Sequence, residues 1–282
     1  MLTARAPGKV NLSLFVGAPR EDGLHPLVSV VQPVSLADEL TLEPAPEAAA
    51  DEVRCPGVDG PNLGARALAL FREATGWDAP PQRLTIVKRV PVAAGMGGGS
   101  ADAAAALRLA AHAAGGAPPE LLHELAAALG ADVPALLAGG RVLMTGAGEH
   151  VERLPDPEPF GLVIVPSDAA LSTPQVYRAF DDLGDARTAD ELESAAQAAL
   201  AGGPPPPVND LEAAARRLCP AIDAALAALR SHGAQAAMVS GSGPTAFGLF
   251  PSVDAARQAA EAIPRAVAVE PVGSAFGEVE PA

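Results

Sequence analysis

The chain has 282 residues, enough for two domains of ordinary size, and its 49% hydrophobic residues can bury a sizeable core, which excludes disorder as the main state. A formal net charge of −15 argues against a general nucleic-acid or membrane-surface binder, because both need a basic face. Cys55 and Cys219 lie far apart without CxxC spacing, which predicts neither a zinc site nor a disulfide framework. With no secretory signal and no uncharged apolar span, we expect a cytoplasmic protein.

The first half alternates strand-like and helix-like segments. Asn62 precedes the first helical pattern and is a plausible N-cap for it. Residues 43–61 are rich in proline, alanine and glutamate and predict an irregular connection. Period-two and helical spacing predict strands at 10–16, 29–36, 39–42, 83–90 and 141–144, and helices at 62–74, 100–114, 120–129 and 133–137.

The composition turns to Asp, Glu and Pro at Pro155–Pro159, which we interpret as a linker between domains of residues 1–155 and 156–282. The prolines of 202–207 predict a stiff connector in the second domain. Further strands are expected at 161–165, 236–239, 245–250 and 266–269, and helices at 173–180, 189–200, 210–218, 221–231 and 253–262. The mixture predicts two α+β domains.

A glycine-rich segment, GMGGGSAD at residues 95–102, follows a predicted strand and opens a predicted helix. Glycines let backbone N–H groups point at an anion, and a helix N-terminus adds a positive dipole end. The segment is neither a Walker A loop nor a GxGxxG fingerprint, because GK[ST] is absent and Ser100 replaces the last glycine. It predicts a phosphate site; the alternative is a flexible turn in which Ser100 caps the helix.

Lys9 and Lys88 are the only lysines in the sequence. Lys9 lies at the start of the first strand, where strand alternation puts Asn11 on the same face. A lysine beside a reacting hydroxyl can stabilise developing negative charge, although a solvated lysine at a strand start is the simpler interpretation. Lys88 follows a β-branched run and is expected to be a solvent-facing strand residue.

Three other segments have both a structural and a functional interpretation. Asp132 begins a short helix with Pro134 in its first turn, which is typical of an N-cap, but its carboxylate could also accept an alcohol proton in phosphoryl transfer. His25 follows a turn, where a histidine is usually exposed. Residues 240–245, SGSGPT, predict either a tight hairpin or a second loop that closes over a phosphate.

These segments, taken together and in this order, resemble the three motifs of the GHMP kinase superfamily. They read APGKVNLSL, PVAAGMGGGSAD and VSGSGPTAFGLF, and the resemblance extends over essentially the whole chain. It implies a two-domain α+β fold, with a ribosomal S5 domain 2-like N-terminal domain, a ferredoxin-like C-terminal domain and the active site between them. Residues 20–40, GADVP and LSTPQVY are most similar to the kinases that phosphorylate the C2 hydroxyl of 4-diphosphocytidyl-2-C-methyl-D-erythritol in non-mevalonate isoprenoid synthesis.

The resemblance also implies roles for individual residues. Lys9 and Asp132 match the catalytic pair, in which the aspartate takes the proton from the C2 hydroxyl and the lysine holds the aspartate and the attacking oxygen. The resemblance implies ATP with Mg²⁺ as the cofactor, and the sequence does not identify the ligands of the Mg²⁺. Residues matching the ATP site are Asn62, Pro91, Val92, Ala93, Ala94, Gly95, Met96, Gly97, Gly98, Gly99, Ser100 and Ala101. Residues matching the substrate site are Asn11, His25, Thr173 and Tyr177, where His25 would contact the edge of cytosine and Tyr177 would stack on it.

Two positions depart from the pattern of the kinase family that the chain resembles. Leu24 replaces a tyrosine that stacks on cytosine, and Asp102 replaces an asparagine near the phosphates, where a carboxylate is unfavourable unless it points away or helps to hold magnesium. Two alternatives therefore stay open: a kinase of the same superfamily for another small alcohol, mevalonate-like or homoserine-like, and a nucleotide-binding protein without catalysis. The presence of both Lys9 and Asp132 favours an enzyme. The sequence leaves the oligomeric state open.

Overall fold

Two long antiparallel strands form the centre of the larger sheet. In the computed structural model, which describes residues 1–58 and 60–282, β1 (Leu2–Val16) pairs with β2 (Leu27–Pro44). Both strands are longer than expected: β1 begins eight residues before the predicted 10–16, and the two strands predicted at 29–36 and 39–42 are one. The pairing register shifts between Pro7 and Lys9 and again between Asn11 and Ser13, and the two strands stay paired on both sides of each shift.

Five shorter strands complete this sheet. The order is β11-β1-β2-β4-β3, and β5 pairs with both β2 and β6. β3 lies within the predicted irregular connection 43–61, of which residue 59 lies outside the described residues. β6 and β11 were not predicted, because such short strands carry too little alternation to be recognised. The bounds are β3 Glu52–Arg54, β4 Gln82–Val87, β5 Val142–Gly146, β6 His150–Arg153 and β11 Glu280–Pro281.

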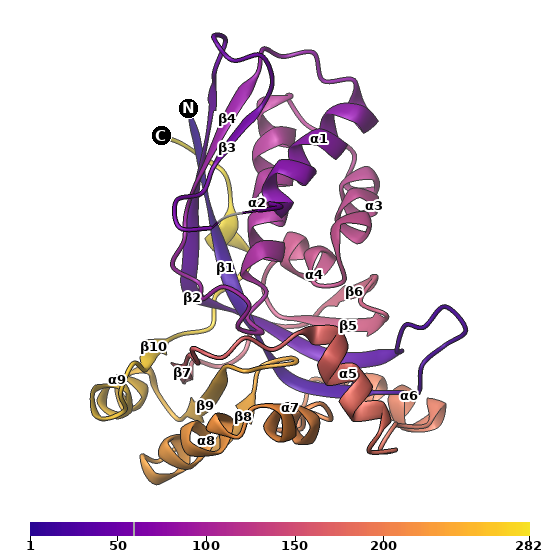
Figure 1. Ribbon diagram of the computed structural model, residues 1–282, viewed down its shortest axis with the longest axis vertical. Helices are drawn as coiled ribbons and strands as arrows, with labels where there is room; N and C mark the ends of the chain where they lie inside the picture. The colour runs from indigo at the N-terminus through magenta and orange to yellow at the C-terminus, as the bar shows by residue number, and fades with distance from the viewer. Residues whose placement is uncertain (59) are drawn as a thin grey trace.

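Four helices cover one face of the large sheet (Figure 1). α2 (Gly98–Ala113) lies in the middle and buries ten of its residues, seven of which are alanines between 101 and 111. Small side chains allow a helix to approach a sheet and its neighbouring helices closely, so the alanine-rich composition becomes a dense core. The other three are α1 Leu63–Thr75, α3 Pro119–Leu129 and α4 Val133–Ala138.

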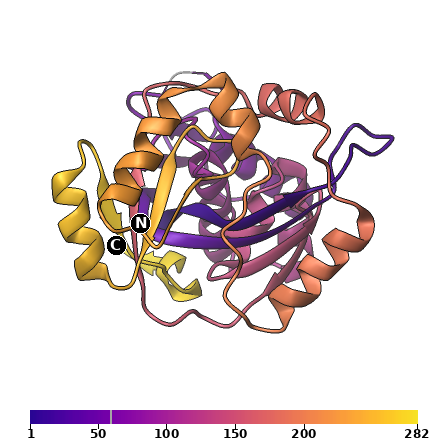
Figure 2. The same cartoon turned by 90° about the horizontal axis from the view of Figure 1, so that it is seen from below.

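The second sheet is antiparallel and has the order β10-β7-β9-β8. Its strands are β7 Gly161–Val165, β8 Ala236–Val239, β9 Ala246–Phe250 and β10 Val267–Val269. Helices α7, α8 and α9 lie below it, as Figure 2 shows from that side. α5 packs against α7, and α6 packs against β1, β2 and β5. The helices are α5 Thr173–Asp181, α6 Ala189–Leu200, α7 Glu212–Leu218, α8 Ala221–Ser231 and α9 Val253–Ala262, followed by a 3₁₀ turn at Ser274–Gly277.

A shared core joins the two sheets. Val10 and Leu12 of β1 are buried in one cluster with Leu162 of β7 and Phe247 of β9, so β1 reaches from the large sheet to the small one. Residues 154–160 connect the sheets without helix or strand, and the division of the chain at residue 155 stays a prediction. Across the described residues, we find no helix with the length and apolar character needed to cross a membrane. The mixed α+β class expected from the sequence is confirmed.

Candidate active site

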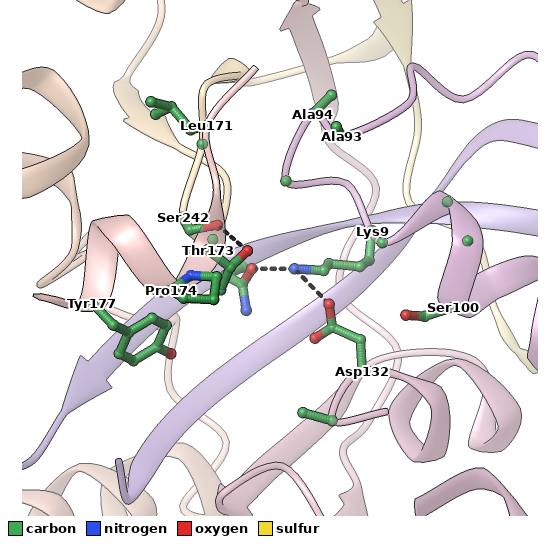
Figure 3. A pocket seen from close by; sticks show the side chains of 18 of the residues that line it. Lys9, Ala93, Ala94, Ser100, Asp132, Leu171, Thr173, Pro174, Tyr177 and Ser242 are labelled. Carbon is green, nitrogen blue, oxygen red and sulfur yellow. Dashed lines mark hydrogen bonds and ion pairs between the residues drawn. The ribbon is translucent and has the colours of Figure 1, made fainter. Parts of the chain in front are cut away.

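A cavity of about 890 Å³ opens between the two sheets. Four segments far apart in the sequence contribute to its lining: the second half of β1, the glycine-rich loop before α2, the turn between β8 and β9, and α5. Figure 3 shows Thr173 and Tyr177 on one side of Lys9 and Asp132, Ser100 on the other side, and Ala93 above the pair. The cavity therefore has two compartments with an ion pair between them.

Lys9 and Asp132 form that ion pair, with Lys9 Nζ 3.4 Å from Asp132 Oδ2 (Figure 3). The lysine side chain is 4% exposed and the aspartate side chain 30% exposed. Asp132 occupies the N-cap position of α4, but its side chain makes no capping hydrogen bond. The carboxylate thus faces the lysine and the cavity, which is not the arrangement of a plain N-cap.

Lys9 is held by a chain of buried hydrogen bonds. Its ammonium donates to Asn11 Oδ1 at 2.8 Å, which confirms that the two residues share a face of β1. The Asn11 amide donates to Ser29 Oγ at 2.8 Å, and that hydroxyl donates to the carbonyl of Ser13 at 2.7 Å. All four side chains are buried. Because each group already has a fixed partner, the ammonium is pre-organised rather than free to rotate.

The glycine-rich loop ends in the first turn of α2. Gly97 is the N-cap, in a left-handed conformation with φ of 66°, so Ser100 lies inside the helix and does not cap it. The first hydrogen bond of the helix runs from the Ala101 N–H to the Gly97 carbonyl. The N–H groups of the preceding residues therefore have no partner within the helix, and a helix start of this kind favours an anion.

The turn between β8 and β9 packs against the glycine-rich loop and donates hydrogen bonds to it. The Ser240 hydroxyl donates to the Gly95 carbonyl at 3.0 Å, and the Thr245 N–H donates to the Ala94 carbonyl at 3.3 Å. A Cβ on Gly95, whose φ is 76°, would lie 2.3 Å from the Ser240 carbonyl oxygen. The predicted hairpin at 240–245 is thus confirmed, and it also fixes the path of the loop that precedes α2.

Most residues that match an ATP site line the cavity. They are Asn62, Pro91, Val92, Ala93, Ala94, Gly95, Gly97, Gly98, Gly99 and Ser100. Asn62 caps α1 as expected, because its Oδ1 accepts from the N–H groups of Gly64 and Ala65. The side chains of Met96 and Ala101 point elsewhere: both are buried in the hydrophobic cores beside the cavity. The backbone carbonyl of Met96 accepts a hydrogen bond from the Lys9 N–H, which links the glycine-rich loop to β1.

Lys88 differs from the expected solvent-facing strand residue. Its side chain is 13% exposed and its ammonium pairs with Asp102 at 2.7 Å and with the fully buried Asp38. Burial raises the pKa of Asp102 to about 7, although the nearby ammonium of Lys88 opposes this shift. The Asp102 carboxylate thus faces Lys88, and both residues line the cavity beside the glycine-rich loop. Local sequence could not reveal this cluster, because Asp38 is 50 residues from Lys88 and joins it only through the sheet.

The residues that match a substrate site gather at the other end of the cavity. Thr173 Oγ1 lies 3.0 Å from Ser242 Oγ, and the rings of His25 and Tyr177 are 4.8 Å apart. The side chain of His25 is 8% exposed, so it is not the exposed turn residue that local sequence favours. Burial, and then the negative charge of Asp132, raise the pKa of Tyr177 to about 12, which keeps its hydroxyl protonated.

Sequence reasoning missed two residues at this end. Ser242 belongs to the turn at 240–245, but the residue itself was not singled out. Asp181 lies four residues after Tyr177 on α5, and Asp181 Oδ1 is 2.7 Å from His25 Nε2. An i, i+4 pair on one helix face was the available signal, since such residues are neighbours on the surface of a helix.

Comparisons with known proteins identify the family. The model for the GHMP kinases N terminal domain matches residues 62–140, and the model for the GHMP kinases C terminal region matches residues 179–269. A protein named 4-diphosphocytidyl-2-C-methyl-D-erythritol kinase from Nocardioides sp. is 44% identical over 91% of each chain. The chain belongs to the GHMP kinase family. A protein of the same name from Streptomyces coelicolor is also 44% identical, over 86% of each chain.

Solved structures of GHMP kinases agree with this assignment. A crystal structure of 4-(cytidine 5'-diphospho)-2C-methyl-D-erythritol kinase is 37% identical, with a TM-score of 0.81 over 96% of this chain and 99% of that one. A homoserine kinase from Cytophaga hutchinsonii, 18% identical with a TM-score of 0.73 over 99% and 97% of the two chains, shares the fold. The two-domain GHMP kinase fold expected from the three motifs is confirmed.

Proposed function

We propose that this GHMP kinase transfers the γ-phosphoryl group of ATP to the C2 hydroxyl of 4-diphosphocytidyl-2-C-methyl-D-erythritol, a step in non-mevalonate synthesis of isoprenoid precursors. The observation that carries the proposal is the position of the Lys9–Asp132 pair between a glycine-rich helix start and the Thr173–Tyr177 compartment. Relatives with this name are 44% identical along most of the chain, which supports the same substrate.

In the proposed mechanism Asp132 accepts the proton of the attacking hydroxyl. Its carboxylate makes no capping bond, is partly exposed and lines the cavity, so it is free to contact a substrate alcohol. The buried Lys9 ammonium, fixed by Asn11, stabilises the negative charge that develops on the attacking oxygen. Both groups act best when the alcohol lies between them and the phosphoryl donor.

We propose that the triphosphate of ATP lies against the loop from Pro91 to Ser100 and the first turn of α2. Two features of this loop favour a triphosphate. The N–H groups at the helix start have no partner within the helix, and Gly95 and Gly97 have the left-handed backbone conformation that glycine adopts most readily. Asn62 would lie beside the adenine. Among the residues described, no three carboxylate, histidine or cysteine side chains gather as a metal site, so phosphate oxygens and water would supply most ligands of Mg²⁺. The cation neutralises phosphate charge when bound.

The cytidyl end of the substrate would occupy the compartment of His25, Thr173 and Tyr177, with Asn11 near the reacting alcohol. Tyr177 offers a partly buried ring for stacking, and His25 offers ring nitrogens for hydrogen bonds. Leu24, 52% exposed at the mouth of this compartment, provides apolar contact only. We place the reaction in the cytoplasm, since Cys55 and Cys219 are free thiols.

The proposal is tested by ADP release with Mg²⁺ and three alcohols: the cytidyl substrate, mevalonate and homoserine. We expect turnover with the cytidyl substrate and at least a hundredfold lower kcat/KM with the other two, because neither fills the aromatic compartment. Preferred use of mevalonate or homoserine would assign the enzyme to another branch of the family. Absence of turnover with all three, in a protein that still binds ATP, would favour a non-catalytic nucleotide-binding role.

A further inference from the structure

The contact between His25 and Asp181 joins two parts of the chain that are 156 residues apart. His25 lies just before β2, and Asp181 is the last residue of α5. The histidine side chain is 8% exposed and the aspartate side chain 37% exposed, with Nε2 and Oδ1 separated by 2.7 Å. Both residues line the cavity, and the ring of Tyr177 packs against the ring of His25 at 48°. The His25 imidazole therefore contacts both the Tyr177 ring and the Asp181 carboxylate.

The carboxylate determines which nitrogen of the imidazole carries the proton. An ionised aspartate can only accept hydrogen bonds, so at 2.7 Å the Nε2 atom of His25 must be the donor. A neutral imidazole has one donor nitrogen and one acceptor nitrogen, and a hydrogen bond to one nitrogen fixes the role of the other. Nδ1 of His25 is then an acceptor. No hydrogen bond from the described residues occupies Nδ1, which leaves it available to a ligand in the cavity.

We propose that Asp181 is a positioning residue that holds His25 in its Nε2–H tautomer and thereby makes the compartment select cytosine over uracil. Cytosine carries a hydrogen-bond donor, the exocyclic amine, at the position where uracil carries a carbonyl acceptor. An acceptor at Nδ1 pairs with the amine and repels the carbonyl. This inference rests on the proposed function, since it assumes that the cytidyl end of the substrate lies beside His25.

The selectivity experiment compares the wild type with Asp181→Asn and Asp181→Glu on the cytidyl and uridyl forms of the substrate. An amide can donate from its NH₂ group to Nε2 and so permits the opposite tautomer, in which Nδ1–H would donate a hydrogen bond to the uracil carbonyl. We expect Asp181→Asn to lower the ratio of the two kcat/KM values about tenfold or more, the size of one base-edge contact, with the KM for ATP unchanged. Asp181→Glu keeps a carboxylate and should retain much of the preference.

Asp182→Asn is the matched control. This neighbouring aspartate is exposed, and the described contacts include no hydrogen bond or ion pair to its side chain. The Asp182→Asn substitution removes the same charge one residue away. A change in base preference that both variants share would therefore reflect net charge rather than the tautomer of His25. The control should keep the wild-type preference. An unchanged preference in Asp181→Asn, or an equal loss in Asp182→Asn, would overturn the proposal.

A second measurement reports the tautomer directly and needs no turnover. In protein labelled with ¹⁵N at its histidines, the ring nitrogens of His25, assigned by comparison with His25→Gln, should show Nε2–H in the wild type and a mixture or Nδ1–H in Asp181→Asn. An unchanged Nε2–H form in the variant would refute the role of Asp181. If the wild type shows the expected tautomer but no activity on the cytidyl substrate, the proposed function fails while the Asp181–His25 contact stands.

Discussion

Asp132→Asn separates the chemical role of this carboxylate from its place in the fold. The amide has nearly the same size and can still accept a hydrogen bond from Lys9, but it cannot take a proton from the substrate alcohol. Because Asp132 caps no N–H group of α4, the helix loses no capping bond. We therefore expect a folded variant that binds ATP normally and fails in phosphoryl transfer.

The expected magnitudes are clearly different for stability and for rate. The Lys9–Asp132 pair is 3.4 Å long and its aspartate is 30% exposed, so its loss should cost about 1 kcal/mol of unfolding free energy, while Lys9 keeps its bond to Asn11. A general base contributes about 10²- to 10⁴-fold in rate, which corresponds to about 3–5 kcal/mol of activation free energy. The loss of activity should thus far exceed the loss of stability.

Single-turnover kinetics with saturating ATP measure the phosphoryl-transfer step, and calorimetric titration with a non-hydrolysable ATP analogue measures binding. Urea denaturation gives the change in unfolding free energy, with Asp182→Asn as the charge-matched control. A variant that keeps half of the wild-type rate would show that Asp132 is not the proton acceptor. A variant that loses ATP binding as well would place Asp132 in the nucleotide site.

Three further outcomes are expected. Gly95→Ala should lower the melting temperature and abolish binding of the ATP analogue, because the added Cβ would lie 2.3 Å from the Ser240 carbonyl oxygen. Gly99→Ala is the control and should fold normally, because the nearest atom to its added Cβ is 3.7 Å away. Equal melting temperatures of the two variants would contradict this expectation. Leu24→Tyr should tighten binding of the cytidyl substrate about tenfold by calorimetry, since stacking contributes about 1–3 kcal/mol, with ATP affinity as the control. Burial raises the pKa of Asp102 from 3.8 to about 7, so between these pH values the folded state binds a proton that the unfolded state has lost, and the contribution of Asp102 to stability falls as the pH rises. In urea unfolding across that range, Asp102→Asn should flatten the dependence of the unfolding free energy on pH. An unchanged dependence would refute the pKa shift.

The order and type of most elements could be predicted from the sequence. Alternation in β1, the apolar spacing of α1 with its Asn62 cap and the alanine-rich run of α2 are local signals. The structure has α1 and α2 where they were expected, and it has β1 at the expected place with eight more residues at its N-terminal end. The glycine-rich loop before α2 is local too, since only glycine adopts the left-handed backbone at 95 and 97 without strain. Three motifs in order were enough to identify the family.

The tertiary structure decided which side chains meet. Lys88 has the sequence surroundings of an exposed strand residue, yet two carboxylates from other elements bury and pair it. The full lengths of β1 and β2 depend on pairing with each other, which no local pattern reports. His25 and Asp181 make the same point at the substrate end: each is unremarkable in its own segment, and only the packing of α5 beside the start of β2 places a carboxylate on the imidazole. Local periodicity encodes backbone conformation, whereas contacts across long separations arise from packing the elements together.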